Sequence, residues 1–127
     1  MARLFRKHYT REQARALLPQ IRQWLNAVAG LRQQLEKHNR RLASLLRCGG
    51  DVGGKVANQW VRTLVAIKTT LREFQTREIQ IKDLDRGLID FPALLGDKEV
   101  FLCWEQGEED IEFWHELHTG YAGRERL

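Results

Sequence analysis

The chain has 127 residues, of which 30% are charged and 43% hydrophobic. This composition is typical of a soluble globular protein of one domain. No apolar run approaches the roughly 20 residues of a membrane helix, and the basic start MARLFRKHYT lacks the apolar segment of a secretory signal. The chain is therefore expected to be cytoplasmic, and Cys48 and Cys103, far apart in sequence, are expected to be free thiols.

The net charge of +4 hides a strong asymmetry along the sequence. Residues 1–75 contain 15 Lys/Arg and 4 Asp/Glu, a net charge of +11, whereas residues 76–127 contain 6 Lys/Arg and 13 Asp/Glu, a net charge of −7. This split favours attraction between the two halves, within one chain or between chains. Nucleic-acid binding through the basic half is a further hypothesis, because phosphate groups are attracted to clustered cations.

Residues 10–47 are predicted to form one long helix. Thr10 and Gln13 fit a capping box, and Pro19 is expected to kink the helix because it removes a backbone donor. Apolar residues recur at steps of three and four, as in a heptad seam. This seam consists of Ala14, Leu17, Ile21, Trp24, Val28, Leu31, Leu35, Leu42 and Leu45. His38 holds the polar position of the seam and is expected to be a packed histidine rather than a ligand.

A glycine-rich connector and a second helix follow. Residues 48–54, CGGDVGG, cannot continue a helix, and no Lys-Ser/Thr pair follows them in the register of a phosphate-binding loop. Residues 55–78 return to the helical period, which predicts a coiled-coil-like antiparallel helical hairpin. Because the first helix is longer than the second, part of its seam is left for the C-terminal half or for another copy. The sequence therefore favours a homodimer.

From residue 79 the hydrophobic period changes to two, which predicts a small antiparallel sheet over residues 79–118 and a tail over residues 119–127. Within this sheet, GLIDFP is expected to form a short strand that ends at Pro92. If the last hairpin turns at Gly107 and Glu108, Leu102 lies opposite Phe113. In that register Cys103 and His115 lie on opposite faces of the sheet. The predicted fold class is α+β, a long helical hairpin followed by a sheet built from hairpins.

Three segments, IKDLDRGLIDFP, VFLCWEQGEEDIEFWHEL and GYAGR, resemble a bacterial family known as domain of unknown function 2203. The opening TREQARALLPQI is similar to the usual start of that family, so the resemblance covers most of the chain. It implies a small stand-alone protein and brings no assigned activity. The signature residues it marks are Asp83, Asp85, Arg86, Gly87, Asp90, Cys103, Trp104, Trp114, His115, Glu116, Gly120 and Gly123.

Side chains that could ligate a metal gather in two of these segments. The candidate ligands are Asp83, Asp85, Asp90, His115 and Glu116. Carboxylates combined with imidazole suit a divalent metal such as Zn or Mn, and a small metal-dependent hydrolase is one hypothesis. Neighbouring residues of a strand point to opposite faces, so His115 and Glu116 do not both enter one site without a bend. The structural interpretation is that the aspartates cap a turn and Arg86 pairs with an acid.

The leading functional hypothesis is a non-catalytic interaction or oligomerisation module. The uncovered part of the helical seam and a sheet with apolar residues on both faces favour it. No catalytic residue is assigned, because the sequence lacks a serine nucleophile motif, and no cofactor-binding motif is present. The aromatic side chains of Trp104 and Trp114 lie in the acidic half and are expected to pack in the sheet rather than to stack on nucleic-acid bases.

Overall fold

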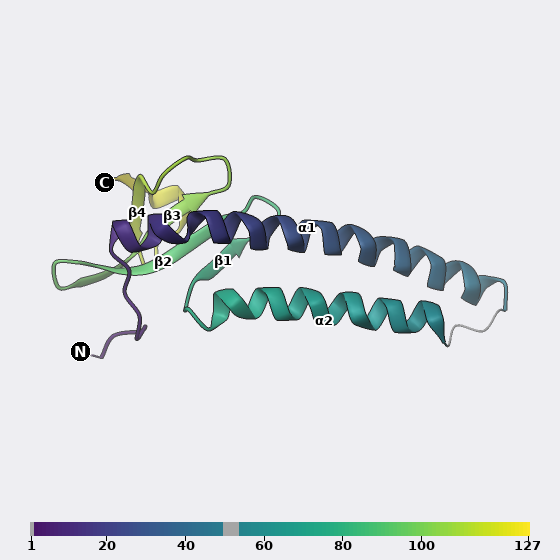
Figure 1. Cartoon of the computed structure of the whole chain (residues 1–127). Helices are drawn as coiled ribbons and strands as arrows, with labels where there is room; N and C mark the ends of the chain where they lie inside the picture. Colours follow the sequence, from purple (N-terminus) through teal and green to yellow (C-terminus); the bar gives the residue numbers. More distant parts are fainter. Residues whose placement is uncertain (1, 50–53) are drawn as a thin grey trace. The chain divides into compact units, whose positions relative to one another are not determined.

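A computed structural model gives the fold of the protein and describes residues 2–49 and 54–127. The helices are α1 (Arg11–Arg47) and α2 (Lys55–Gln75). The later elements are β1 (Gln80–Asp83), β2 (Leu88–Leu95), β3 (Lys98–Glu105), β4 (Phe113–Glu116), the 3-10 helix η1 (Tyr121–Gly123) and β5 (Glu125–Arg126). Two helices precede a five-stranded antiparallel sheet, so the predicted α+β class is confirmed (Figure 1).

The chain divides into two compact units. Unit 1 consists of Met1–Arg22 and Phe74–Leu127, and unit 2 is Gln23–Glu73. Helix α1 belongs to both units, because Arg22 and Gln23 are consecutive residues within it. The single domain predicted over residues 1–127 stays a prediction for this reason. No helix in the described part of the chain is long and apolar enough to cross a membrane.

The sheet of unit 1 is a meander in which sequential strands are neighbours, in the order β1-β2-β3-β4-β5. The central strands are buried on both faces, as the unbroken buried run from Leu88 to Ala93 shows. The first turns of α1 cover one face, where the guanidinium of Arg22 lies 5.5 Å from the ring centre of Trp104 (Figure 1). Because both faces are covered within unit 1, the apolar sheet does not by itself require a second copy of the chain.

Local hydrogen bonds set the ends of the two helices. The predicted capping box is confirmed, since Gln13 N–H donates to Thr10 Oγ1 at 3.1 Å and Thr10 N–H donates to Gln13 Oε1 at 3.0 Å. Helix α2 ends at Gln75 instead of residue 78, because Glu78 adopts a left-handed φ of 58° and Ile79 N–H closes back on the Phe74 carbonyl.

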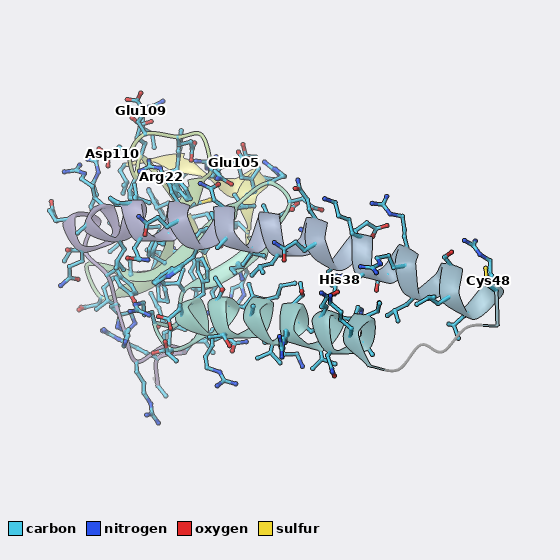
Figure 2. The ribbon with its side chains drawn as sticks, turned by 45° about the vertical axis from the view of Figure 1, so that its right-hand side comes forward. Arg22, His38, Cys48, Glu105, Glu109 and Asp110 are labelled. Atoms are coloured by element: carbon cyan, nitrogen blue, oxygen red, sulfur yellow. The ribbon has the colours of Figure 1, made fainter. Side chains whose placement is uncertain are left out.

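Unit 2 is a helical hairpin formed by the later part of α1 and by α2. Trp60 of α2 donates its indole N–H to Asn39 Oδ1 of α1 at 2.8 Å. The predicted seam residues Leu31, Leu35, His38, Leu42 and Leu45 are half-buried. Figure 2 shows His38 on the side of α1 that faces α2, and Cys48 at the end of α1. Of the predicted connector over residues 48–54, residues 50–53 lie outside the described part.

The predicted register of the last hairpin is wrong by one residue. Leu102 pairs with Trp114 rather than with Phe113, and Cys103 pairs with Phe113. The connection is longer than a tight turn, because Glu105 N–H binds the Glu108 carboxylate at 2.7 Å and β4 begins only at Phe113. A shift of one residue moves every side chain of a strand to the other face. His115 therefore lies on the same face as Cys103, contrary to the prediction.

Two further differences concern the limits of the strands. Strand β2 continues past Pro92 to Leu95, and the turn to β3 is formed by Gly96 and Asp97, with Gly96 at a φ of 64°. The residues expected as a tail contain η1 and β5, and β5 pairs with β4. These additional pairings place β4 inside the sheet, where a residue can be buried on either side.

Candidate functional site

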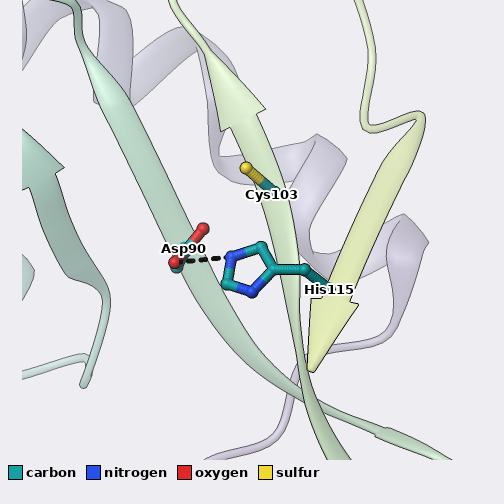
Figure 3. Close-up of side chains that lie close together, drawn as sticks. All are labelled: Asp90, Cys103 and His115. Atoms are coloured by element: carbon teal, nitrogen blue, oxygen red, sulfur yellow. Dashed lines mark hydrogen bonds and ion pairs between the residues drawn. The ribbon is translucent and has the colours of Figure 1, made fainter. Parts of the chain in front are cut away.

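Three polar side chains meet on one face of the sheet, each from a different strand. Asp90 of β2 pairs in register with Cys103 of β3, and His115 of β4 pairs with Phe101, two residues from Cys103. One ligand atom from each of Asp90, Cys103 and His115 lies within 4.8 Å of the other two (Figure 3). All three residues are buried, with exposed fractions of 1% or less.

The hydrogen bonds of His115 determine how its ring is oriented. Nδ1 lies 2.7 Å from the backbone carbonyl of Glu116, and Nε2 lies 2.9 Å from Asp90 Oδ2. A carbonyl oxygen only accepts, so Nδ1 carries a hydrogen and donates it. Nε2 is thereby directed at the carboxyl group of Asp90, and one proton is held between these two atoms. The second oxygen, Asp90 Oδ1, is buried without a hydrogen-bond partner among the described residues.

The electrostatics of the cluster follow from its burial. Burial raises the pKa of Asp90, and the charge of His115 and the neighbouring Cys103 oppose this only in part. Burial and the nearby Asp90 raise the pKa of the Cys103 thiol to about 12. The thiol is therefore protonated at neutral pH and is a poor nucleophile. Cysteine catalysis would require the opposite shift, so the arrangement does not support it.

Aromatic rings separate the cluster from solvent. Phe101 lies 5.5 Å from His115 and 5.4 Å from Phe5, measured between ring centres. The ammonium group of Lys82 lies over the same Phe101 ring at 4.9 Å. Phe5 belongs to the N-terminal arm, residues 4–9, which thus reaches the face of the sheet that carries the cluster.

Two carboxylates hold the N-terminal arm by its backbone. Glu99 accepts hydrogen bonds from the N–H groups of Leu4 and Phe5 at 2.8 and 3.0 Å, and His8 Nε2 lies 2.7 Å from the same carboxylate. Glu78 accepts from the N–H groups of Arg6 and Lys7. Burial raises the pKa of Glu99, but the hydrogen bonds from His8 and from the backbone outweigh it, so the net pKa is lowered.

The structure brings only two of the five predicted ligands together, Asp90 and His115. Asp83 accepts the backbone N–H of Arg86 at 3.1 Å and caps the turn between β1 and β2. Asp85 is exposed in that turn. Glu116 forms an ion pair with Lys98 on the solvent side of β4. The residues Asp83, Asp85 and Glu116 are not part of the buried cluster.

Arg86 pairs with an acid, as the turn interpretation predicts, and this acid is Glu105, at 2.8 Å. Gly87 then ends the turn at a φ of 66°, where a Cβ atom would lie 2.6 Å from Gln106 Cβ. The motif KDLDRGLIDFP is thus two features. Its first part forms a turn that requires glycine, and its second part carries Asp90 into the core.

Cys103 is the member of the cluster that the sequence does not predict. The predicted register places Cys103 and His115 on opposite faces, which argues against a pair. The prediction that Phe101 and Cys103 share a face of the sheet is correct. The position of His115 is predicted wrongly because the loop from Gln106 to Glu112 is longer than the predicted turn. A charged residue in the middle of the apolar run LIDFPALL, which is buried from Leu88 to Ala93, is the sequence signal that points to Asp90.

Comparison with known proteins agrees with the motifs. No curated protein and no solved structure matches the chain. A family model matches residues 7–127, which include the capping box, both helices, the turn that ends at Gly87 and all three residues of the buried cluster. The chain therefore belongs to the family described as uncharacterized conserved protein DUF2203.

Proposed function

We propose that the protein binds one divalent transition-metal ion, with zinc as the preferred ion, through Asp90, Cys103 and His115. The observation that carries this proposal is the convergence of a carboxylate, a thiol and an imidazole from three adjacent strands to within 4.8 Å. Zinc bonds of about 2.0–2.3 Å keep neighbouring ligand atoms roughly 3.5 Å apart, so a small inward movement of the side chains completes the geometry.

The second nitrogen of His115 supports this assignment. Metal-binding histidines generally donate the hydrogen of their other nitrogen to a carbonyl or carboxylate, which fixes the ring. Nδ1 of His115 makes this bond to the Glu116 carbonyl, so Nε2 is the ligand atom. Asp90 Oδ1 is the second supporting atom, because it is buried and no described residue satisfies it. A bound cation would remove the cost of leaving that oxygen unpaired.

The chemistry of the three donors selects among metals. A thiolate is a soft ligand and favours zinc over magnesium or calcium, which prefer oxygen. Manganese, which prefers carboxylate and carbonyl oxygen, is also less suited to a site that contains Cys103. Binding displaces two protons to solvent, the thiol proton of Cys103 and the proton held between His115 Nε2 and Asp90, and the charges of one thiolate and one carboxylate then balance the charge of Zn²⁺. The site is therefore neutral when the metal is bound, as its apolar surroundings require.

The proposed role of the ion is to join strands β2, β3 and β4. The side chains of Asp90 and His115 are 1% and 2% exposed, so a substrate has no route to them in this conformation. Buried zinc sites contribute directly to folding stability. Three protein ligands leave a fourth position on the ion, and burial keeps substrate away from it, whereas a metal-dependent hydrolase requires that position to be open to substrate.

Metal content of protein prepared without a histidine tag tests the proposal. We expect about one zinc per chain after loading and dialysis, and a rise in the melting temperature on zinc addition. With cobalt in place of zinc, a thiolate-to-metal absorption band is expected, because Cys103 ligates. Cys103→Ala should abolish the band, whereas Cys48→Ala and Asp85→Ala should retain both band and stoichiometry. Failure of wild-type protein to retain zinc, or a band that survives in Cys103→Ala, would overturn the site.

Self-association through unit 2 is a second candidate function. Val61 and Val65 of α2 lie one helical turn apart and are 49% and 56% exposed, and the seam from Leu31 to Leu45 is only half-buried. A second copy that covers these residues would form a homodimer. A dimeric mass in light scattering at micromolar concentration, lost in the Val61→Ser/Val65→Ser variant, is the expected result. A monomeric mass for the wild type would remove this candidate.

A further inference from the structure

The two units differ in how their charges are balanced. The acidic groups of unit 1 are largely engaged inside it. Its ion pairs include Arg15 with Asp110 at 2.8 Å, Arg86 with Glu105 at 2.8 Å, Arg124 with Glu108 at 2.7 Å, and His8 with Glu99 at 2.7 Å. Glu78 and Glu99 also accept backbone N–H groups of the arm. The acidic C-terminal segment is therefore neutralised within unit 1, partly by basic residues that precede Gln23 and partly by its own arginines.

Unit 2 has no comparable supply of acids. Its 51 residues, Gln23–Glu73, contain nine Lys/Arg and three Asp/Glu, a net charge of +6. The cations of this unit are Arg32, Lys37, Arg40, Arg41, Arg47, Lys55, Arg62, Lys68 and Arg72, and all nine side chains are exposed. In the part of unit 2 that the structure describes, no ion pair involves Lys37, Arg41 or Arg47. This excess of positive charge is consistent with an anionic partner.

The helical period places these cations on the outside of the hairpin. Lys37 and Arg41 are one turn apart, and Arg40 and Arg47 are two turns apart, so each pair shares a side of α1. The half-buried seam residues Leu35, His38 and Leu42 occupy the opposite side. From Lys37 to Arg47 the basic surface of α1 extends for about 15 Å at 1.5 Å per residue, which spans several phosphates of a duplex.

We propose that the basic surface of unit 2, which consists of the nine cations named above, binds the phosphate backbone of double-stranded nucleic acid without sequence specificity. Arginine accounts for six of the nine, and its planar guanidinium binds phosphate through two hydrogen bonds. A duplex suits the surface better than a single strand does. Single-strand binding uses exposed aromatic rings for stacking, and Trp24 and Trp60 of unit 2 are half-buried.

Other anionic partners fit the surface less well. A helix that lies on a membrane needs a broad apolar face with aromatic anchors. The large hydrophobic side chains exposed in the described part of unit 2 are Leu46, Val61 and Val65, which include no aromatic residue. The acidic face of a second chain is also a poor partner, because many carboxylates of unit 1, including Asp110, Glu105 and Glu108, already pair with cations of that unit. Charge complementarity therefore favours phosphate groups of a duplex.

Two double variants with equal reduction of positive charge test the surface. Arg40→Gln/Arg41→Gln removes two cations from unit 2, and Lys98→Gln/Arg126→Gln removes two exposed cations from unit 1, where the Lys98 and Arg126 side chains are 55% and 71% exposed. Binding to a fluorescently labelled duplex of about 20 base pairs, longer than the basic surface of α1, is measured by anisotropy between about 50 and 200 mM salt. Circular dichroism confirms that both variants keep their helices.

The wild type should bind the duplex at about 50 mM salt, with an affinity that falls steeply as salt increases. The unit 2 variant should bind at least about tenfold more weakly, and its salt slope should be shallower by about 0.9 for each phosphate that the variant no longer neutralises. The unit 1 variant should stay within about twofold of wild type. Absence of wild-type binding at low salt would overturn the proposal, and so would equal weakening in the two variants. Tighter binding to acidic phospholipid vesicles than to the duplex would assign the surface to a membrane instead.

Discussion

Unit 1 and unit 2 are stabilised over very different distances along the chain. In unit 1, Arg11 Nε donates to the carbonyl of Ile111 at 2.7 Å, and Arg15 pairs with Asp110, so residues 95 to 100 positions apart are in direct contact. In unit 2, the hydrogen bond between Trp60 and Asn39 joins residues 21 apart. Unit 1 is thus a long-range structure with buried polar groups, whereas unit 2 is a local pairing of two helices.

This difference explains the charge asymmetry of the sequence. The basic and acidic halves do not correspond to the two units, because residues 1–22 leave the basic half and fold onto the acidic one. The expected attraction between halves is therefore satisfied within unit 1 by the arm and by the start of α1. What remains is a hairpin with a net charge of +6. A charge pattern along a sequence thus indicates interactions, but the fold decides which residues are left over.

The largest expected effect comes from breaking the buried pair in unit 1. His115→Ala leaves Asp90 buried without its partner, which should lower the free energy of unfolding by about 3–5 kcal/mol. His38→Leu in unit 2 is the matched control, since His38 Nδ1 is buried and has no partner among the described residues. This control should be neutral or stabilising by up to about 1 kcal/mol. Urea unfolding followed by circular dichroism measures both, and similar losses would contradict the contrast between the units.

Glycine substitutions give a smaller and more selective test. Gly87, Gly96 and Gly49 all have a φ between 64° and 71°, so alanine should cost about 1–2 kcal/mol of stability at each. At Gly87 the new Cβ would also lie 2.6 Å from Gln106 Cβ, which should add about 1–3 kcal/mol. At Gly96 in unit 1 and at Gly49 in unit 2, no atom lies within 4 Å of the place that a Cβ atom would take. Thermal denaturation should therefore rank Gly87→Ala clearly below the other two, and equal melting temperatures would show that the close approach is absent.

The smallest expected effect is a pH dependence of the N-terminal arm. The pKa of Glu99 is lowered in the folded state, so its contribution to stability is present above its unfolded pKa of about 4.3 and is lost as the pH falls through the lower folded value. The amide NMR signals of Leu4 and Phe5, whose N–H groups bind the Glu99 carboxylate, should move below about pH 4. Glu99→Gln should remove this titration. A titration that persists in the variant would assign it to another group.

The helices and the fold class could be predicted because they depend on local patterns. The capping box at Thr10 and the recurrence of apolar residues indicate α1 without knowledge of any distant contact. The turn at Gly96–Asp97 also has a recognisable hairpin sequence, but the sequence predicts that the strand ends at Pro92. In the structure, by contrast, Pro92 lies inside β2, and the strand continues to Leu95.

The site was only partly predictable because it depends on register. Ligand type alone identifies Asp90 and His115 as candidates. The presence of Cys103 beside them depends on the length of the loop before Phe113, which is set by hydrogen bonds of Glu108 to Glu105 and to Arg124. These contacts join residues whose proximity is known only once the sheet has formed. Asp85 is the opposite case. Its carboxylate makes it a predicted ligand, but it lies exposed in the turn before Gly87 and outside the cluster.

The long-range contacts of unit 1 also determine the order in which the chain can fold during synthesis. The hairpin of unit 2 is complete once residue 73 has been made, because its partners lie within Gln23–Glu73. The start of α1 must wait with Leu18 and its neighbours uncovered until the strands emerge. Closure extends to the last residue, since Leu127 N–H donates to the carbonyl of Glu112 at 2.9 Å. The polypeptide thus completes its sheet unit only after Leu127 has been made, and the N-terminal arm is among the last segments to find its partners.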